Sequence, residues 1–231
     1  MHRLFSRFWS TDDRGLTVLL AVMVVYLLIL YPFSTLGAFG GFVISLFFTL
    51  VLISGVTAVT DRSFIKIPAI AFILLIFVLH HYLLKSQATL LDFIDTLVSL
   101  IFLGLFEFVV LFHVFREGPI TAHRIRGAIV AYMLFGLIWA QSYLLIELYS
   151  PNSFDINGLP YVPLIHQLTA SLIYFSFVTL TTIGYGDITA INPFARALVM
   201  FEGLMGQLFP AILIARLVSL QIYQKESGRD K

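Results

Sequence analysis

The chain contains no cysteine, and charged residues make up only 12% of its 231 residues. Without cysteine there is no disulfide framework, no thiolate metal site and no cysteine nucleophile. Soluble domains carry about 25% charged residues, so this chain has too little charge to cover its surface in water. The net charge of +1 also provides no basic field that would attract nucleic acid, and we expect no nucleic-acid partner.

Hydrophobic residues are present in excess. They make up 59% of the sequence, and the mean hydropathy is +0.96. They occur in continuous runs, and a run of about 20 apolar residues is long enough to cross a bilayer. The runs lie at residues 16–36, 42–60, 65–84, 91–115, 128–149 and 194–220. The sequence therefore predicts an all-α integral membrane protein with six transmembrane helices.

A different kind of segment separates the fifth and sixth runs. Residues 150–163 are polar and rich in turn-forming residues, and residues 164–180 are apolar but short for a span. The apolar stretch leads into Thr-Thr-Ile-Gly-Tyr-Gly-Asp at 181–187. Because irregular backbone is tolerated at membrane depth only where protein or water encloses it, we expect a re-entrant pore helix and loop.

Lysine and arginine are concentrated in alternate connections. The rich connections contain Arg3, Arg7 and Arg14; Arg62 and Lys66; Arg116, Arg124 and Arg126; and Lys225, Arg229 and Lys231. Since cytoplasmic loops hold the positive excess, both termini are predicted to be cytoplasmic. The expected location is the plasma membrane or a bacterial inner membrane.

The glycine-containing segment has the chemistry of an ion filter. Gly184 and Gly186 can adopt backbone angles that are closed to other residues, so successive carbonyls can face one axis. A ring of such carbonyls replaces the water around a potassium ion. Ile183 and Tyr185 would then point away from the axis to brace the ring, and Thr182 can add a hydroxyl oxygen at the inner end.

This segment resembles the filter signature of tetrameric potassium channels, Thr-(Val/Ile)-Gly-Tyr-Gly-Asp. The resemblance extends over roughly residues 126–220. It implies a homotetramer in the lipid bilayer and K+ bound at Thr182, Ile183, Gly184 and Tyr185, with Gly186 completing the path to the outer mouth.

The same resemblance implies roles for positions around the filter. Support and outer-mouth roles fall to Thr181, Asp187, Tyr174, Phe175 and Arg196. In the last run, Gly206 matches a common hinge position, and Pro210, one turn later, would itself kink the helix. These two residues are the candidates for a gate or hinge.

The fourth run departs from the pattern of voltage-gated relatives. Residues 91–115 contain no lysine or arginine, and their charges are Asp92, Asp95 and Glu107. Each charge crossing the field contributes only about 2.3 kcal/mol per 100 mV. A helix without basic residues therefore cannot act as an ordinary voltage sensor.

Two polar residues in the last run have open roles. A charge at the depth of Glu202 costs about 2.5–3.5 kcal/mol on insertion scales, so this residue either lines a cavity, pairs behind the filter, or is neutral and hydrogen-bonded for packing. Gln207 is a second cavity candidate. The boundary with the best sequence support separates residues 1–124, a four-helix region of unknown role, from residues 125–231, the pore region.

The function predicted from these features is passive K+ conduction by one subunit of a channel, with K+ as the permeant ion and no cofactor. No nucleophile with its base and no metal triad is recognisable, so we do not expect an enzyme. The alternatives are a potassium transporter and a non-conducting accessory membrane subunit.

Overall fold

The computed structural model describes residues 13–59, 63–83, 89–115, 122–156 and 165–229. The described part is nearly all helical, which confirms the predicted fold class at that level. Its helices are α2 (Asp13–Ser34), α3 (Gly37–Val59), α4 (Ser63–Leu83), α5 (Thr89–Phe115), α6 (Ala122–Tyr149), α7 (Ile165–Leu180) and α8 (Pro193–Arg229).

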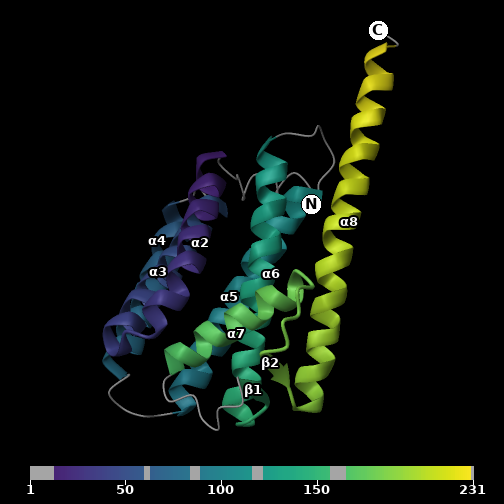
Figure 1. Cartoon of the computed structure of the whole chain (residues 1–231). Coiled ribbons are helices and arrows are strands. Elements are labelled where there is room, and N and C mark those ends of the chain that lie inside the picture. The colour runs from purple at the N-terminus through teal and green to yellow at the C-terminus, as the bar shows by residue number, and fades with distance from the viewer. Residues whose placement is uncertain (1–12, 60–62, 84–88, 116–121, 157–164, 230–231) are drawn as a thin grey trace.

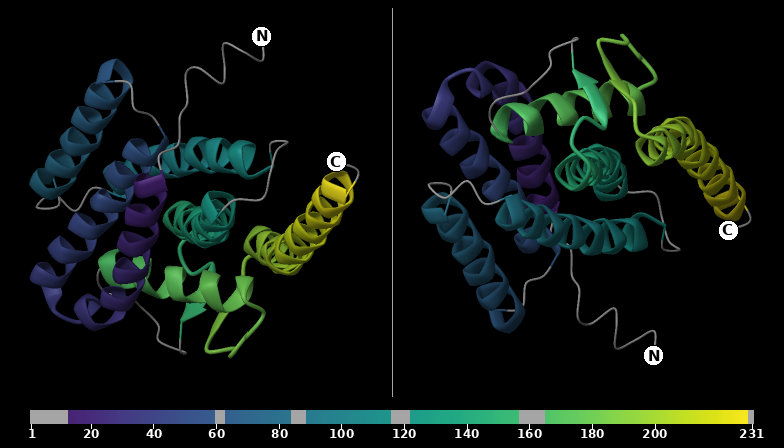
Figure 2. Two further views of the ribbon diagram at one scale, coloured as in Figure 1. Left: turned by 90° about the horizontal axis from the view of Figure 1, so that it is seen from above. Right: turned by 90° about the horizontal axis from the view of Figure 1, so that it is seen from below.

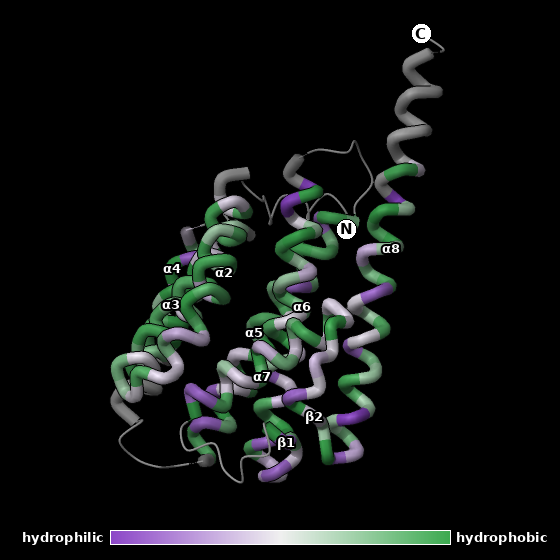
Figure 3. The backbone as a smooth tube through the Cα atoms, viewed as in Figure 1, coloured by the Kyte–Doolittle hydropathy of each residue, from purple (hydrophilic) through white to green (hydrophobic). Residues whose placement is uncertain are grey.

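The long helices follow the apolar runs because a chain in hydrocarbon must satisfy its backbone hydrogen bonds within each segment. Among the described residues, five helices are long and apolar enough to cross a membrane, namely α2, α3, α5, α6 and α8. Helix α4 is not among these five, and its described apolar stretch is Lys66–Leu75. Hydrophobic residues extend along most of α2, α3 and α5 (Figure 3).

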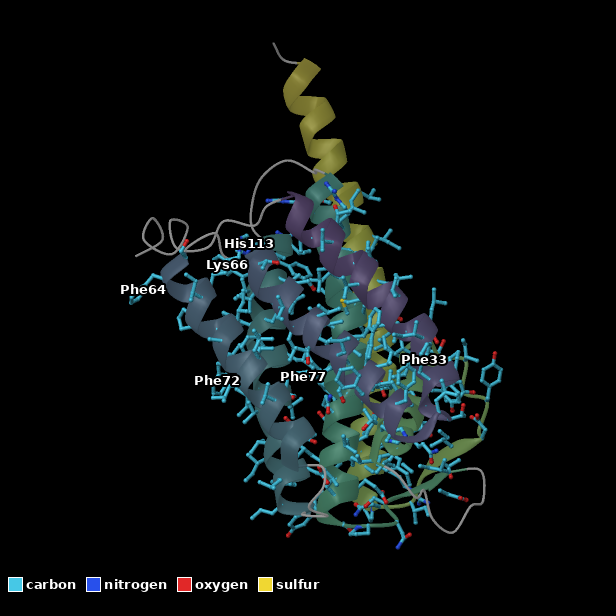
Figure 4. The ribbon with its side chains drawn as sticks, turned by 90° about the vertical axis from the view of Figure 1, so that its left-hand side faces the viewer. Phe33, Phe64, Lys66, Phe72, Phe77 and His113 are labelled. Atoms are coloured by element: carbon cyan, nitrogen blue, oxygen red, sulfur yellow. The ribbon has the colours of Figure 1, made fainter. Side chains whose placement is uncertain are left out.

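Helix α6 lies near the centre of the molecule, with α4 and α8 on opposite sides of it (Figure 2). The main hydrophobic core joins α2, α3, α5 and α6 and also includes Ala170 and Ile173 of α7 and Phe209 of α8, and α6 contacts both α7 and α8. The side view shows Phe64 and Phe72 of α4 pointing away from the other helices (Figure 4). Helix α4 is therefore peripheral.

Two short strands, which the sequence analysis does not predict, pair with each other on either side of the segment that contains α7. Strand β1 (Phe154–Ile156) pairs antiparallel with β2 (Ile188–Ala190), with Asp155 opposite Thr189. Because β1 follows α6 and β2 precedes α8, the segment containing α7 begins and ends at the same end of the molecule (Figure 1).

Helix α8 is much less buried by the rest of the chain than the central helix α6 is. In the most apolar stretch of each helix, only 17% of α8 is buried, compared with 50% of α6. A single chain therefore leaves an extended apolar face of α8 uncovered.

Candidate functional site

The candidate site begins where α7 ends. The Thr181 amide donates to the Phe177 carbonyl at 3.0 Å, and the Thr181 hydroxyl donates to the same carbonyl at 2.6 Å. The next residue, Thr182, has a φ of 61°. This left-handed backbone stops the helix and turns the chain into the extended segment.

Backbone handedness alternates along that segment. Thr182, Gly184 and Gly186 have φ values of 61°, 57° and 78°, whereas Ile183 and Tyr185 do not have positive φ. In an ordinary strand successive carbonyls point to opposite sides, and alternating handedness instead turns them toward one side. The expectation for the two glycines fits this backbone. The left-handed Thr182 was not anticipated, because a residue with a Cβ is disfavoured there by about 1–2 kcal/mol.

The amides of the segment are anchored to the end of α7. Thr182 donates to the Thr179 carbonyl at 2.9 Å, and Ile183 and Gly184 donate to the Val178 carbonyl at 2.9 and 3.3 Å. These bonds satisfy the last turn of the helix, whose carbonyls have no intrahelical partner. They also hold the start of the segment in one register on α7.

The side chains of Ile183 and Tyr185 are not enclosed by their own chain. They are 54% and 70% exposed, and every residue from Thr181 through Asp187 is exposed. The sequence reading expected both side chains to brace the filter from surrounding protein. A single chain does not supply that protein.

Behind the segment, the two adjacent aromatic residues of α7 have different surroundings. The Tyr174 hydroxyl lies close to the Asp187 carboxylate, and the Tyr174 ring packs edge-on against Tyr31 of α2, with the ring centroids 5.4 Å apart. Phe175 is buried against Tyr143 and Phe154, with ring centroids 5.5 and 5.6 Å away. Tyr174 therefore lies beside the Asp187 end of the segment, and Phe175 fixes α7 to α6 and β1.

The return path to α8 is held by backbone contacts. Asp187 accepts a bond from the Ile188 amide at 3.1 Å, and the Arg196 side chain donates to the Ala190 carbonyl at 2.9 Å. The amides of Ile191 and Asn192 donate to the Ser153 carbonyl. Arg196 thus ties the start of α8 to β2, the strand that directly follows Asp187.

Glu202 is completely buried and bonded on both carboxyl oxygens. Tyr143 of α6 and Ser176 of α7 each lie 2.5 Å from it. Ser176 also lies 2.7 Å from the Gly136 carbonyl, yet its hydroxyl has only one proton. A neutral Glu202 satisfies the whole set, because it can donate to Ser176 while Ser176 donates to Gly136. Of the three roles left open for Glu202, the neutral and hydrogen-bonded form agrees with these contacts.

The start of the segment is a close junction of three helices. An added Cβ at Gly206 of α8 would lie 2.0 Å from the Leu180 carbonyl oxygen, to which the Tyr132 hydroxyl donates at 3.0 Å. Glycine at this position therefore permits α8 to touch the end of α7. Helix α8 continues through Gly206 and Pro210, and their role as a hinge stays a prediction. Gln207 is exposed on α8.

The sequence reading did not single out three side chains at this site, namely Tyr132, Tyr143 and Ser176. Each is a polar group within an apolar run, and that is the only signal the sequence offers. It also missed Glu147, whose carboxylate accepts bonds from the amides of Asn152, Ser153 and Phe154 at 2.7–3.1 Å. Glu147 stabilises the turn between α6 and β1.

Comparisons with known proteins agree with this geometry. Residues 166–222, which contain α7, the segment after it and most of α8, match a protein-family model described as an ion channel. The chain is also 29% identical over 115 residues to the two-pore potassium channel 5 of Arabidopsis thaliana. That alignment covers 48% of this chain and 25% of the relative, so the chain spans about a quarter of the plant protein's length.

The comparisons support an ion channel, and the matched family is a family of channels and not of enzymes. The matched part of the chain is the part that contains the alternating backbone and the buried Glu202. The candidate site and the channel-like region are therefore the same part of the molecule.

Proposed function

We propose that this chain is one subunit of a tetrameric potassium-selective channel that conducts K+ passively. The observation that carries the proposal is the alternating backbone of Thr182, Gly184 and Gly186 at the end of α7. The carbonyls of Thr182, Ile183, Gly184 and Tyr185 would coordinate K+ in place of its water, with Gly186 leading to the outer mouth.

Four copies around one axis are required to complete this site. One chain supplies one strand of carbonyls, and identical subunits close a ring through repeated contacts of one type. The exposed side chains of Ile183 and Tyr185 and the uncovered face of α8 are the surfaces that neighbouring copies would bury. The relative is named as a potassium channel, which agrees with the proposed ion.

The proposed topology has six membrane-spanning helices, α4 included, with both termini cytoplasmic in a plasma or bacterial inner membrane. The positive connections favour this orientation. Helix α7 would enter from the outside without crossing, because the paired strands bring both of its connections to one end. Its C-terminal end, which carries the negative end of the helix dipole, would point toward the ion path and favour a cation there.

Opening would not depend on an ordinary voltage sensor, because α5 contains no lysine or arginine. The leading helices nevertheless contact the proposed inner helix. Arg216 of α8 donates a hydrogen bond to the carbonyl of Phe115 at the end of α5 and lies over the Phe115 ring, 4.9 Å from its centroid. This contact gives α5 a direct connection to α8.

Ion flux through the purified protein in liposomes tests the proposal. Under a potassium gradient we expect flux that favours K+ over Na+ and is blocked by barium. Gly184→Ala should abolish most of the flux, because a Cβ is disfavoured by about 1–2 kcal/mol at φ 57° in each of four subunits. Gly104→Ala is the matched control, since nothing lies within 4 Å of a Cβ built on this glycine of α5.

The control variant should conduct like the unmodified chain. Unchanged K+ flux and selectivity in Gly184→Ala would contradict the filter assignment. Absence of flux from folded tetramers of the unmodified chain would favour a non-conducting accessory subunit.

A further inference from the structure

Glu202 is an acidic residue within an apolar helix, and the hydrogen bonds around it depend on its proton. Its side chain is 0% exposed, and the hydroxyl oxygens of Tyr143 and Ser176 each lie 2.5 Å from one of its carboxyl oxygens. Tyr143 belongs to α6, Ser176 to α7 and Glu202 to α8. One carboxyl group therefore joins the outer helix, the pore helix and the inner helix of the proposed channel.

Ser176 has a second contact that limits how the protons are shared. Its hydroxyl oxygen lies 2.7 Å from the Gly136 carbonyl oxygen of α6 as well as 2.5 Å from Glu202. A hydroxyl has one proton to donate, and a carbonyl can only accept. When Glu202 is protonated, it donates to Ser176, and Ser176 donates to Gly136. When Glu202 is ionised, both neighbours of Ser176 are acceptors, so one of the two hydrogen bonds is lost.

The bond to Gly136 is the one that would break. Hydrogen bonds to an ionised acceptor are about twice as strong as bonds between neutral groups, and a buried carboxylate that lacks hydrogen bonds is very costly. The Gly136 carbonyl, in contrast, still accepts a bond within its own helix. Loss of the Glu202 proton therefore removes a hydrogen bond between α7 and α6.

The contact between α7 and α6 adjoins the start of the proposed filter. Gly136 also packs against Phe177, the residue after Ser176, and a Cβ built on Gly136 would lie 2.7 Å from the Phe177 ring. The Phe177 carbonyl accepts hydrogen bonds from the amide and the hydroxyl of Thr181. The position of Ser176 and Phe177 on α6 therefore determines where the segment after α7 begins.

Among the described residues, few other titratable groups surround Glu202. Helix α8 contacts α6, α7 and β2, and β2 contains no titratable side chain. The charged side chains of α6 lie toward its two ends, and Tyr132 of α6 is near enough to interact with the charge of Glu202. His166 and Tyr174 of α7 lie against α3 and α2. Because tyrosines ordinarily lose their protons only at about pH 10, a proton lost from this junction at lower pH comes from Glu202.

We propose that Glu202 is a positioning residue whose bound proton holds α7 against α6 and thereby maintains K+ selectivity. With the proton bound, Ser176 connects α8 to α6 through α7. Without it, α7 loosens and the filter discriminates less between K+ and Na+. The effect on selectivity rests on the proposed function, whereas the attachment of α7 can be measured without ion flux.

Ion flux in liposomes at a series of pH values tests the effect on selectivity. Between about pH 5 and 9, a range that covers exposed and buried carboxyl groups, the K+/Na+ flux ratio of the unmodified chain should fall with rising pH. A fall of about tenfold is expected, since one hydrogen bond is lost in each subunit. In Glu202→Gln the amide donates to Ser176 at every pH, so the ratio should not depend on pH.

Two further variants complete this experiment. Glu107→Gln changes another buried carboxyl group, which lies on α5 and has no hydrogen bond, and it should keep the pH dependence of the unmodified chain. Ser176→Ala removes the hydroxyl that connects Glu202 to Gly136, so it should abolish the pH dependence as Glu202→Gln does. A flux ratio of the unmodified chain that does not change with pH, or the same fall in Glu202→Gln, would overturn the proposal.

Infrared spectroscopy and hydrogen exchange test the proton and the attachment without ion flux. The difference spectrum between the unmodified chain and Glu202→Gln should contain the carbonyl stretch of a protonated carboxyl group, which should disappear as the pH rises. Amide exchange in the last turn of α7 should then become faster in the unmodified chain than in Glu202→Gln at the same pH. If both results are obtained and no chain conducts, the proposed function fails and the attachment stands. Absence of the band, or equal exchange at every pH, would overturn the positioning role even in a channel that conducts K+.

Discussion

At the scale of single residues, hydrogen-bond partners and backbone angles distinguish positions of the same residue type. Gly184 and Gly206 are both glycines of the pore region, but their surroundings differ. Gly184 has a φ of 57° with open space around it, whereas Gly206 lies in close contact with the Leu180 carbonyl. Glu107 and Glu202 are both buried carboxyl groups, but only Glu202 has hydrogen bonds. These differences lead to different expected outcomes of substitution.

Glu202 tests the hydrogen-bond network that joins α6, α7 and α8. Because the neutral acid satisfies every partner, Glu202→Gln should change the free energy of unfolding by less than about 1 kcal/mol. Glu202→Ala should lower it by about 2–4 kcal/mol, since a cavity forms and the hydroxyls of Tyr143 and Ser176 lose their partner. Thermal unfolding in detergent compares the two variants. Equal losses in both would show that Glu202 is required as a charged group.

Gly206 tests the contact between α8 and the end of α7. Gly206→Ala places a methyl group 2.0 Å from the Leu180 oxygen, so the helices must separate, at a cost of about 1–3 kcal/mol. K+ selectivity in the liposome assay should also fall when the helices separate, because Leu180 immediately precedes the proposed filter. Gly203→Ala is the control on the same helix, where nothing lies within 4 Å of a Cβ. If both variants behave like the unmodified chain, the contact is not as close as described.

At the scale of elements, α7 connects most of the features of the site. Its last turn anchors the amides of the segment that follows it, and its Ser176 reaches Glu202. It is only 16 residues long, and it is held in place by α6 and α8. Displacement of α7 by a neighbouring element would therefore be transmitted to the filter backbone.

Helix α5 contains a buried carboxyl group whose removal should be favourable. Glu107 is 4% exposed, and both of its carboxyl oxygens are buried without a hydrogen bond. An unsatisfied buried polar group costs about 1–3 kcal/mol, so Glu107→Leu should raise the free energy of unfolding by a similar amount. Thermal unfolding measures this change. A lower unfolding temperature would show that Glu107 has a partner in the assembled protein.

At the scale of the whole molecule, the distribution of exposed apolar residues differs between the two sides. The exposed residues of α4 lie at the periphery, where lipid can cover them, and those of α8 lie on the side that carries the filter (Figure 2). Only the exposed surface of α8 has to be buried against other copies of the chain if the proposed filter is to close into a ring.

The oligomeric state tests this asymmetry. Native mass spectrometry of the detergent-solubilised protein should give a mass of four chains. Phe201→Ser, on the exposed face of α8, should reduce the tetramer fraction because it removes apolar contact area at the interface. Phe72→Ser is a control of similar exposure on α4 and should leave the tetramer intact. A monomer or dimer of the unmodified chain that still conducts K+ would contradict the proposed assembly.

The sequence by itself determined the helical class and the position of the site. Apolar runs predict helices without knowledge of neighbours, because hydrophobicity is a property of consecutive residues. The apolar stretch at residues 164–180 corresponds to α7, Ile165–Leu180, and the motif at 181–187 marked the segment with alternating backbone.

Tertiary structure decided which groups meet. Glu202 lies 26 residues from Ser176 and 59 from Tyr143, and the strands β1 and β2 pair across the whole of α7. The left-handed Thr182 is held by bonds to the end of α7 and not by its own preference. Such features depend on distances between remote segments, and these distances are set only when the helices pack.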